Sequence, residues 1–242
     1  MNNSFAIVDS RISKKCEIAL TERGYSVIKL SPMDILPKPI ASHTDIILFR
    51  IENTLFLSKK YAAENKSSYE LLRSLEKSSI INIALTEEQQ CENYPFDAIF
   101  NGLVMNGRLF CKSDTFSREI IEFAKKQGYK IVNTKQGYPA CTTLKISETA
   151  AITADRGMAK TLEAEGISVL TVETGGISLP PYEYGFIGGC GGLCDGTVYF
   201  LGDIESHKNK EEIKDFVNKN FCHIESLSDE RLSDLGGILF IK

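Results

Sequence analysis

A cysteine stands where an alternating apolar segment begins near the middle of the chain, in the run 139–146 (Pro-Ala-Cys-Thr-Thr-Leu-Lys-Ile). A cysteine attacks as its thiolate, which a neighbouring cation or histidine stabilises by lowering the thiol pKa. Because strand side chains alternate, Lys145 and Thr143 share one face with Cys141. Of the seven cysteines, we select Cys141 as the candidate nucleophile; the alternative is a buried, unreactive thiol.

Two other segments carry residues that could contact a ligand. In the strand predicted over Asp45–Glu52, Arg50 and Glu52 lie on one face, where they either bind a ligand or form an internal ion pair. The run 186–192 contains Gly188 and Gly189 and is nearly bare of side chains, which indicates the close approach of a ligand or of another backbone. This run lacks the Lys-Ser/Thr of a phosphate loop, so nucleotide binding is not predicted.

Metal and cofactor chemistry have little support in the sequence. Cys190 and Cys194 have a Cys-x-x-x-Cys spacing, but no second pair accompanies them and His207 lies a strand away. We therefore predict no metal site and no cofactor.

The candidate residues belong to a unit that recurs five times along the chain. Each unit is an apolar strand, a turn, a second strand, a helix and a third strand, and first strands are expected near residues 45, 97, 141, 185 and 235. The spacing of about 44 to 52 residues is typical of repeat arrays and propellers. One such unit cannot bury its own strands, so neighbours must complete the core.

The fifth unit is split between the chain ends. Its first strand is predicted over 236–242, and its remaining elements over 5–30. A unit made from both termini predicts a closed ring, with a single domain over residues 1–242. The predicted units cover 235–242 plus 1–30, 43–85, 95–134, 138–173 and 182–227.

A ring of this kind has an axis where a site can form. If the helices pack outside, the polar faces of the first strands point toward the axis, and the loops between units surround its mouth. A small-molecule pocket there is the default prediction. The alternatives are an axis filled by side chains and ordinary surface loops.

Composition excludes several classes of function. The net charge is −4, from 28 basic and 32 acidic residues, and no basic stripe is present, so nucleic acid is not an expected partner. The apolar runs are strand-length, which argues against a membrane partner. Seven scattered cysteines and an N-terminus without a signal pattern favour a reducing, cytoplasmic location.

The five ββαβ units resemble the pentein, or guanidino-group-modifying enzyme, superfamily over nearly the whole chain. That superfamily includes arginine deiminases, amidinotransferases, dimethylarginine dimethylaminohydrolases and a ribosome anti-association factor, and this chain looks most like its small bacterial members. The resemblance implies an α/β fold, a five-bladed propeller with pseudo-fivefold symmetry, closed by pairing of the N- and C-terminal strands.

The resemblance also implies roles for three residues. The superfamily's nucleophilic cysteine lies at the mouth end of a first strand in a Cys-x-Thr/Ser-x-aliphatic pattern, which Cys141 matches if the units are circularly permuted. In that order His43 is similar in position to the catalytic histidine. Asp97 lies where the enzymes carry a polar residue in the preceding unit, and we assign it as the partner that orients His43.

The carboxylates that bind guanidinium in these enzymes are absent from the two strands expected to carry them, over 186–189 and 235–238. With Arg50 and Lys145 expected at the axis, a neutral or anionic ligand is favoured over an arginine-type substrate. Glu183 or Asp234, in the loops around the mouth, could replace a lost carboxylate.

Three hypotheses follow. In the first, the chain binds a small molecule at the axis, an anionic or neutral ligand in place of an arginine-type substrate. In the second, it is a Cys141-dependent hydrolase or amidinotransferase-like enzyme. In the third, it is a non-catalytic interaction protein. The residues predicted to bind the ligand are Arg50, Asn101, Thr143, Lys145, Gly188, Gly189 and Glu183. The oligomeric state is not predicted.

Overall fold

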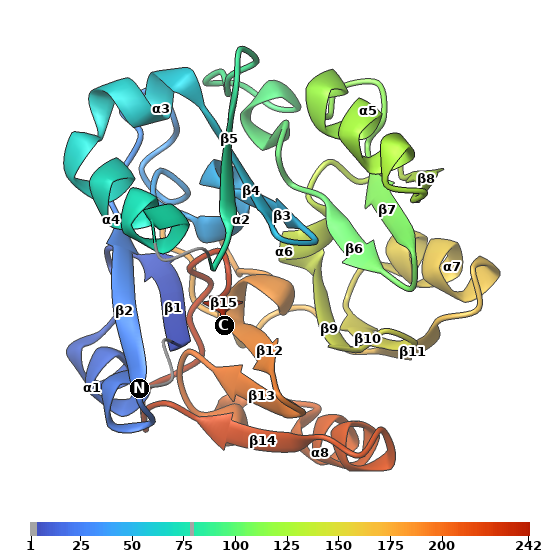
Figure 1. Cartoon of the computed structure of the whole chain (residues 1–242). Coiled ribbons are helices and arrows are strands. Elements are labelled where there is room, and N and C mark those ends of the chain that lie inside the picture. Colours follow the sequence, from blue (N-terminus) through green and yellow to red (C-terminus); the bar gives the residue numbers. More distant parts are fainter. Residues whose placement is uncertain (1–3, 78–79) are drawn as a thin grey trace.

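The chain forms five three-stranded sheets arranged around a common axis (Figure 1). The computed structural model describes residues 4–77 and 80–242. In every sheet the middle strand pairs antiparallel with the first strand and parallel with the third. A parallel pair needs a crossover, and a helix supplies it in each case. We call each sheet with its helices a blade.

Blade 1 contains β15 (Leu239–Ile241), β1 (Ser4–Asp9), α1 (Lys14–Glu22) and β2 (Tyr25–Leu30). Blade 2 contains α2 (Thr44–Ile47), β3 (Phe49–Ile51), β4 (Thr54–Ser58), α3 (Lys59–Glu64), α4 (Lys66–Lys77) and β5 (Asn82–Thr86). Blade 3 contains η1 (Phe96–Ala98), β6 (Leu103–Met105), β7 (Arg108–Cys111), α5 (Arg118–Lys126) and β8 (Lys130–Asn133). Blade 4 contains α6 (Pro139–Thr142), β9 (Thr143–Ser147), β10 (Ala150–Thr153), α7 (Arg156–Ala164) and β11 (Ser168–Thr171). Blade 5 contains η2 (Gly188–Cys190), β12 (Gly191–Cys194), β13 (Thr197–Phe200), η3 (Ile204–Ser206), α8 (Lys210–Lys219) and β14 (His223–Ser226).

Blade 1 closes the ring, because both ends of the chain meet in its sheet. Phe5 lies opposite Ile241, and Ala6 lies opposite Phe240. The same β1 strand pairs in parallel with β2 over its whole length. This pairing of the N- and C-terminal strands confirms the predicted closed, five-bladed architecture.

The hydrophobic core is divided among the interfaces between blades. Five clusters are found among the described residues, and each lies mainly between one neighbouring pair: blades 1 and 2, 2 and 3, 3 and 4, 4 and 5, and 5 and 1. The cluster between blades 1 and 2 also includes Ala98 of blade 3 and Cys141 of blade 4. Middle strands are covered on both faces, and β4 and β10 are buried at every residue. The blades therefore depend on one another, as expected for units too small to bury their own surfaces.

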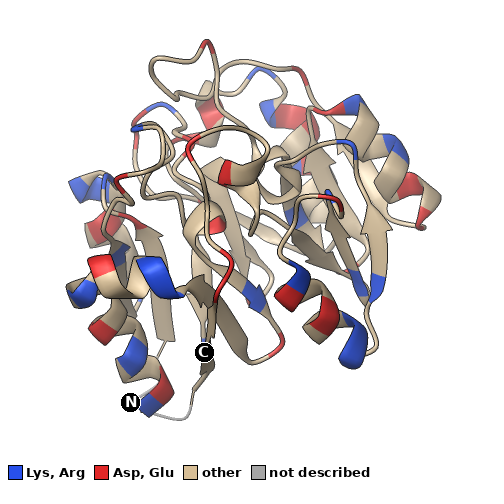
Figure 2. Cartoon of the chain, turned by 90° about the horizontal axis from the view of Figure 1, so that it is seen from above, with Lys and Arg blue, Asp and Glu red and all other residues tan. Residues whose placement is uncertain are grey.

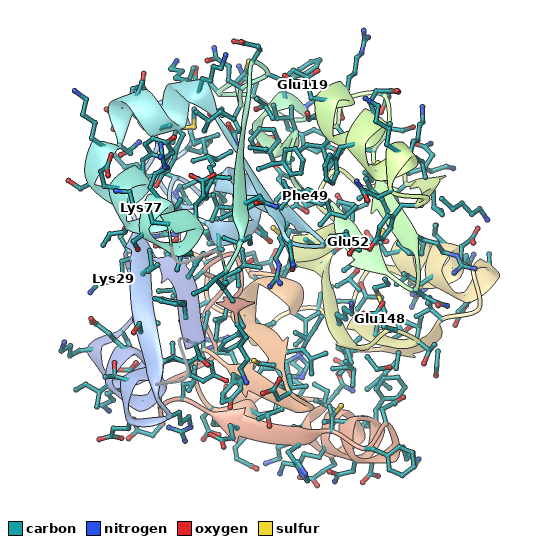
Figure 3. All side chains as sticks on the ribbon, viewed as in Figure 1. Lys29, Phe49, Glu52, Lys77, Glu119 and Glu148 are labelled. Atoms are coloured by element: carbon teal, nitrogen blue, oxygen red, sulfur yellow. The ribbon has the colours of Figure 1, made fainter. Side chains whose placement is uncertain are left out.

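The helices follow the predicted period. In α5, Ile120, Ile121 and Ala124 are buried, and the Ser117 side chain caps the helix by accepting from the Ile120 N–H. Charged residues of both signs lie mainly on the outer helices and loops (Figure 2). Lys77 and Glu119 point outward, whereas Phe49 lies within the interior (Figure 3). Among the residues described, no helix combines the length and apolarity needed to cross a membrane.

The predicted first strands begin too early, and this difference positions the site. Where strands were expected from Asp45, Asp97, Cys141 and Gly185, blades 2 to 5 instead carry a short helical turn before a strand of only three to five residues. The apolar run continues from turn to strand, so periodicity in so short a segment cannot separate the two. Each turn gathers its residues near the axis, whereas a continuous strand would space the same residues along its length.

Candidate functional site

The site is built from the turns that precede the first strands. His43 is the N-cap of α2, and Asp45 lies in that helix. Cys141 lies in α6, and Gly188 lies in η2. Blade 1 contributes Asp234, a few residues before β15. Segments far apart in the sequence therefore meet at one end of the axis.

His43, Asp45 and Cys141 form the centre of this site. The ligand atoms of the three side chains, an imidazole nitrogen, a carboxylate oxygen and the thiol sulfur, all lie within 4.8 Å of one another. His43 is 1% exposed and Cys141 is 3% exposed. The predicted nucleophile and the predicted acid/base are thus adjacent and nearly removed from bulk water.

Asp234 occupies the place beside His43 that was predicted for Asp97. Its Oδ1 lies 3.9 Å from His43 Nδ1, and both His43 nitrogens are buried without a hydrogen-bond partner among the described residues. Backbone N–H groups hold the carboxylate, because Phe186 donates to Oδ2 at 2.8 Å and Gly236 donates to Oδ1 at 3.1 Å. Asp234 is therefore oriented independently of the imidazole.

Asp97 instead hydrogen-bonds to the hydroxyl of Tyr138. It is buried in η1, and burial raises the pKa of its carboxyl group. Tyr138 immediately precedes α6, so Asp97 supports the turn that carries Cys141 and makes no contact with His43 among those that the structure describes.

Asn101 joins the turns of blades 2, 3 and 4. Its Nδ2 donates to the Cys141 sulfur at 3.1 Å and to the backbone oxygen of Asp45 at 3.1 Å. Its Oδ1 accepts from the Ala140 N–H at 2.8 Å. Asn101, predicted as a ligand-binding residue, thus holds the thiol in position.

Glycine is required where the turns pack against each other. A Cβ on Gly188 would lie 2.1 Å from the Ala140 oxygen and 2.7 Å from the Cys141 oxygen. A Cβ on Gly189 would lie 1.9 Å from an oxygen of Asp234. Both distances are far below normal contact, so these glycines allow blade 5 to approach the Cys141 turn and the Asp234 carboxylate. This matches the predicted close approach of backbone in the glycine run.

The electrostatic field at the thiol is negative. Burial raises the pKa of Cys141 well above its usual value, and Asp45 and Asp234 raise it further. Burial lowers the pKa of His43, although Asp234 and Asp9 oppose that shift. The thiol and the imidazole are therefore both neutral at pH 7 in the free protein.

This field overturns the expectation that the site lacks carboxylates. The two strands do lack them, as the sequence shows, but Asp234 from a loop and Asp45 from α2 flank the thiol instead. Asp234 was named as a replacement for a lost carboxylate; Asp45 was missed because it was assigned to the start of a strand. Its position two residues after His43, within the same short helical segment, was the available signal.

A cavity of about 340 Å³ opens onto these groups. His43, Cys141 and Asp234 line it, together with Tyr138 and Glu183. The remaining walls are mainly apolar and aromatic and come from the loops at the mouth: Ile40, Leu179, Tyr182, Tyr184 and Phe186. The pocket predicted at the mouth of the axis is present, and its wall includes the predicted Glu183.

Four of the predicted ligand-binding residues line a second cavity of about 490 Å³, to which the first strands of all five blades contribute and which Asp45 also lines. Gly189 lines neither of these two cavities. Arg50, Thr143, Lys145 and Gly188 lie there. Arg50 donates to the Phe240 oxygen at 2.7 Å, and Lys145 donates to the Val104 oxygen at 3.2 Å. Since both cations already have partners, neither strengthens the case for an anionic ligand at the thiol.

The same central trio is the one group among the described residues that could hold a metal ion. Nitrogen, oxygen and sulfur donors within 4.8 Å suit a borderline-soft cation such as zinc, provided that the thiol loses its proton. Cys190 donates its S–H to the Ile187 oxygen at 3.1 Å and belongs to no such group.

The raised pKa of Asp45 gives a testable pH dependence. Burial raises it from 3.8 to about 6, so the folded state binds a proton more tightly than the unfolded state, and this stabilisation is lost as the pH rises from about 4 to about 6. Asparagine mimics the protonated form. We expect the free energy of unfolding of Asp45→Asn, relative to wild type, to increase over this range by up to about 3 kcal/mol, because a difference of one in pKa is equivalent to about 1.36 kcal/mol.

Urea denaturation at pH 4 and pH 7.5 measures this difference. Asp114→Asn serves as the control: Lys112 lowers the pKa of that exposed carboxyl below 3.8, so this group titrates mainly below pH 4 and its difference from wild type should stay nearly constant between the two pH values. An Asp45→Asn difference that stays constant between the two pH values would show that Asp45 does not titrate in this way.

Known structures share this architecture. A mutant of dimethylarginine dimethylaminohydrolase from Pseudomonas aeruginosa, complexed with citrulline, is 7% identical, with 94% of this chain and 92% of that chain covered and a TM-score of 0.58. Agmatine deiminase from C. jejuni is 11% identical, with coverage of 93% and 87% and a TM-score of 0.54. Inosamine-phosphate amidinotransferase from Streptomyces griseus is 12% identical, with coverage of 94% and 78% and a TM-score of 0.55.

Identities this low establish the fold alone, and that fold is the pentein propeller that the repeat pattern predicts. The search of curated proteins found no match. A family model described as "Family of unknown function (DUF6873)" matches residues 7–239. The chain, a pentein-fold protein, therefore belongs to this family.

Proposed function

We propose that the protein is a cysteine-dependent enzyme that acts on a small substrate carrying a guanidinium or amidinium group. The observation that carries this proposal is the convergence of Cys141, His43 and Asp234 at one cavity, with an Asp45 carboxylate oxygen within 4.8 Å of the thiol and imidazole. Cys141 is the nucleophile, His43 moves protons, and the two carboxylates bind the cationic group.

The charge of the site favours a cation over an anion. Two carboxylates flank the thiol, a buried one from Asp234 and a half-buried one from Asp45, and removal from water raises the pKa of each. A planar guanidinium or amidinium donates in two directions and pairs well with carboxylates in a site shielded from water. Such a ligand would relieve the repulsion between the carboxylates, whereas an anion would add to it.

The same cation would activate the nucleophile. In the free protein the raised pKa keeps Cys141 as a thiol. A positive charge held beside the sulfur stabilises the thiolate and lowers that pKa, and the thiol proton passes to His43. The site thus becomes reactive when a cationic substrate is bound.

The reaction follows from these positions. The Cys141 thiolate attacks the central carbon and forms a C–S bond; protonated His43 gives its proton to the departing amine as the C–N bond breaks. His43 then takes a proton from water, which attacks the same carbon. The C–S bond breaks, and the proton returns to the sulfur. An amine in place of that water would make the reaction an amidino transfer.

The structural relatives are consistent with this class of chemistry. Their names describe a hydrolase of dimethylarginine, a deiminase of agmatine and an amidinotransferase. All three act on guanidino or amidino groups. Because their identity to this chain is low, the proposed substrate class rests on the residues of the site and not on these names.

Two reagents of the same size and leaving group test the proposal. Chloroacetamidine is cationic and chloroacetamide is neutral; each alkylates a thiolate with loss of chloride. Cys91 is exposed, whereas Cys141 is buried with a raised pKa. We expect chloroacetamide to label Cys91 first at pH 7, and chloroacetamidine to label Cys141 at least about tenfold faster than chloroacetamide does.

Peptide mass spectrometry of a time course measures both rates, and Cys91→Ser removes the competing exposed thiol. Equal rates for the two reagents at Cys141 would contradict a cation-binding site, and no labelling by either would contradict a reactive thiol.

A further inference from the structure

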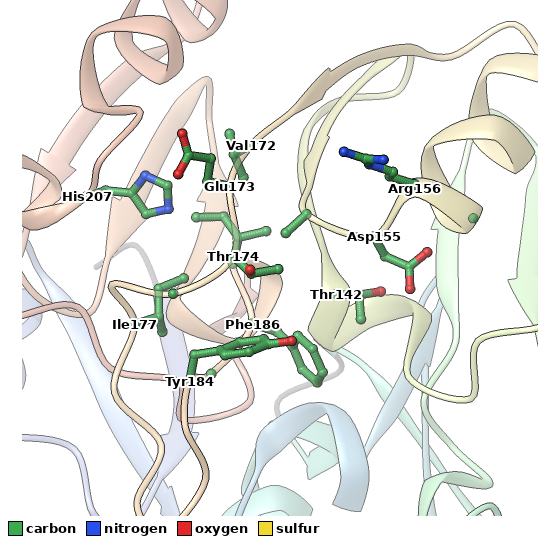
Figure 4. Close-up of a pocket in the computed structure, with 15 residues that line it drawn as sticks. Thr142, Asp155, Arg156, Val172, Glu173, Thr174, Ile177, Tyr184, Phe186 and His207 are labelled. Carbon is green, nitrogen blue, oxygen red and sulfur yellow. The ribbon is translucent and has the colours of Figure 1, made fainter.

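A third cavity lies between blades 4 and 5, beside the Cys141 cavity. It measures about 380 Å³, and it shares Tyr184 and Phe186 with its neighbour. Its floor is apolar, with Val172 and Ile177 among the residues that line it (Figure 4). None of the residues assigned above to catalysis lines this cavity.

His207 supplies an unpaired donor to this cavity. The side chain is 2% exposed, and its ring projects into the pocket (Figure 4). Nδ1 accepts from the Asn209 N–H at 3.0 Å, so the proton of the neutral ring lies on Nε2. Nε2 is buried and has no hydrogen-bond partner among the described residues. A buried, unpaired donor is costly, so a ligand that accepts from it would be favoured.

Arg156 adds an unpaired charge on the opposite side. It is the first residue of α7, and its exposed guanidinium has no hydrogen-bond or ion-pair partner within the described part of the chain. Figure 4 shows it across the cavity from His207. The positive end of the α7 dipole lies at the same place.

The acidic residues of the cavity already have partners. Asp155 accepts from the Met158 N–H at 2.7 Å and from the Gln136 amide at 3.0 Å. Glu173 lies 3.6 Å from the Lys208 ammonium. The groups without partners are therefore donors, which indicates an oxyanion ligand. The two nearby carboxylates would repel a dianion such as phosphate more strongly than a monoanion.

We propose that this cavity is a second ligand site, which binds a small monocarboxylate with an apolar body. His207 Nε2–H donates to the carboxylate, Arg156 pairs with it, and the body packs on Val172, Ile177 and Phe186. This site is independent of the chemistry at Cys141.

Three probes with the same apolar body test the proposal: 3-methylbutanoate, 3-methylbutanamide and 3-methylbutylamine. Each is titrated into the full-length protein, and the His207 ring nitrogens are followed by ¹⁵N NMR while calorimetry gives the Kd. We expect the carboxylate to bind and to shift the Nε2 signal, and the amide and amine to bind at least about tenfold more weakly, because a charge-assisted hydrogen bond is lost.

Two variants locate the site. His207→Asn keeps an acceptor for the Asn209 N–H but removes Nε2–H. Arg156→Gln removes the charge at an exposed position. Each substitution should weaken binding of the carboxylate by about tenfold or more. Arg118→Gln is the matched control, since Arg118 is exposed at the first position of α5 in blade 3 and should leave the Kd unchanged. Cys141→Ser should also leave it unchanged, which separates this result from the proposed enzyme activity.

The proposal is overturned if 3-methylbutanoate leaves the His207 signal unmoved. It is equally overturned if the acid binds with the same Kd after both His207→Asn and Arg156→Gln, or if the amide binds as tightly as the acid.

Discussion

Replacement of Cys141 by serine is expected to reduce turnover of guanidino or amidino substrates by a factor on the order of 10⁴ or more, because a covalent mechanism loses its nucleophile. Serine is close in size to cysteine and can accept from Asn101, so the turn of α6 should keep its shape. Release of ammonia or amine from a panel of guanidino compounds measures the loss, and circular dichroism with thermal melting checks that the protein is folded.

Cys190→Ser is the matched control for this prediction. Cys190 is also buried, its pKa is also raised by burial, and it lies in η2, the turn of blade 5 that corresponds to α6 in blade 4. Its thiol, however, does not line the Cys141 cavity. We expect Cys190→Ser to retain turnover within about twofold. Turnover that survives in folded Cys141→Ser would exclude Cys141 as the nucleophile.

Gly188→Ala, in the blade 5 turn that packs against the Cys141 turn, is expected to displace Cys141 and reduce its reactivity. The new Cβ would overlap three backbone oxygens, those of Ala140, Cys141 and Thr143, at 2.1, 2.7 and 2.6 Å. Backbone cannot rotate away, so the turn that carries Cys141 must move. Overpacking of this kind costs about 1–3 kcal/mol of stability, and a displacement of about 1 Å at a reacting atom can cost about 10²-fold in rate.

Chloroacetamidine labelling of Cys141 and urea denaturation measure these two effects. Gly24→Ala is the control, because a Cβ on Gly24 meets no atom within 4 Å while its φ of +85° carries the backbone cost of alanine. Its stability should fall by about 1 kcal/mol with labelling of Cys141 unchanged. A Gly188→Ala protein that labels at the wild-type rate would mean that η2 does not set the position of the thiol.

Much of the fold could be predicted because the residue pattern within each repeat indicates its strands and its helix. The helix period in α5, the buried middle strands and the turn before each third strand are local patterns, and the split fifth unit predicts that β15 pairs with β1. The turns α2 and α6 could not be predicted, since each is only four residues long and lies within an apolar run that also suits a strand.

The site could be predicted only in part. The resemblance selected Cys141 and His43, and the structure brings them together. It did not select Asp45, and it assigned to Asp97 the place beside His43 that Asp234 holds. The packing of turns from different blades decides which carboxylate faces the imidazole. This packing cannot be predicted from the residue spacing within one blade.

Composition and periodicity by themselves determined the five units, their order and the closure of the ring. The reason is that the buried face of each strand or helix requires apolar residues at a regular local spacing, which the sequence shows directly. The tertiary structure decided the charge around the thiol and the separation of the two axial cavities. Asp45 and Asp234 are 189 positions apart in the chain, and the distance between their charges and the sulfur depends on backbone contacts at Gly188, Gly189 and Gly236 that exist only once the blades have closed.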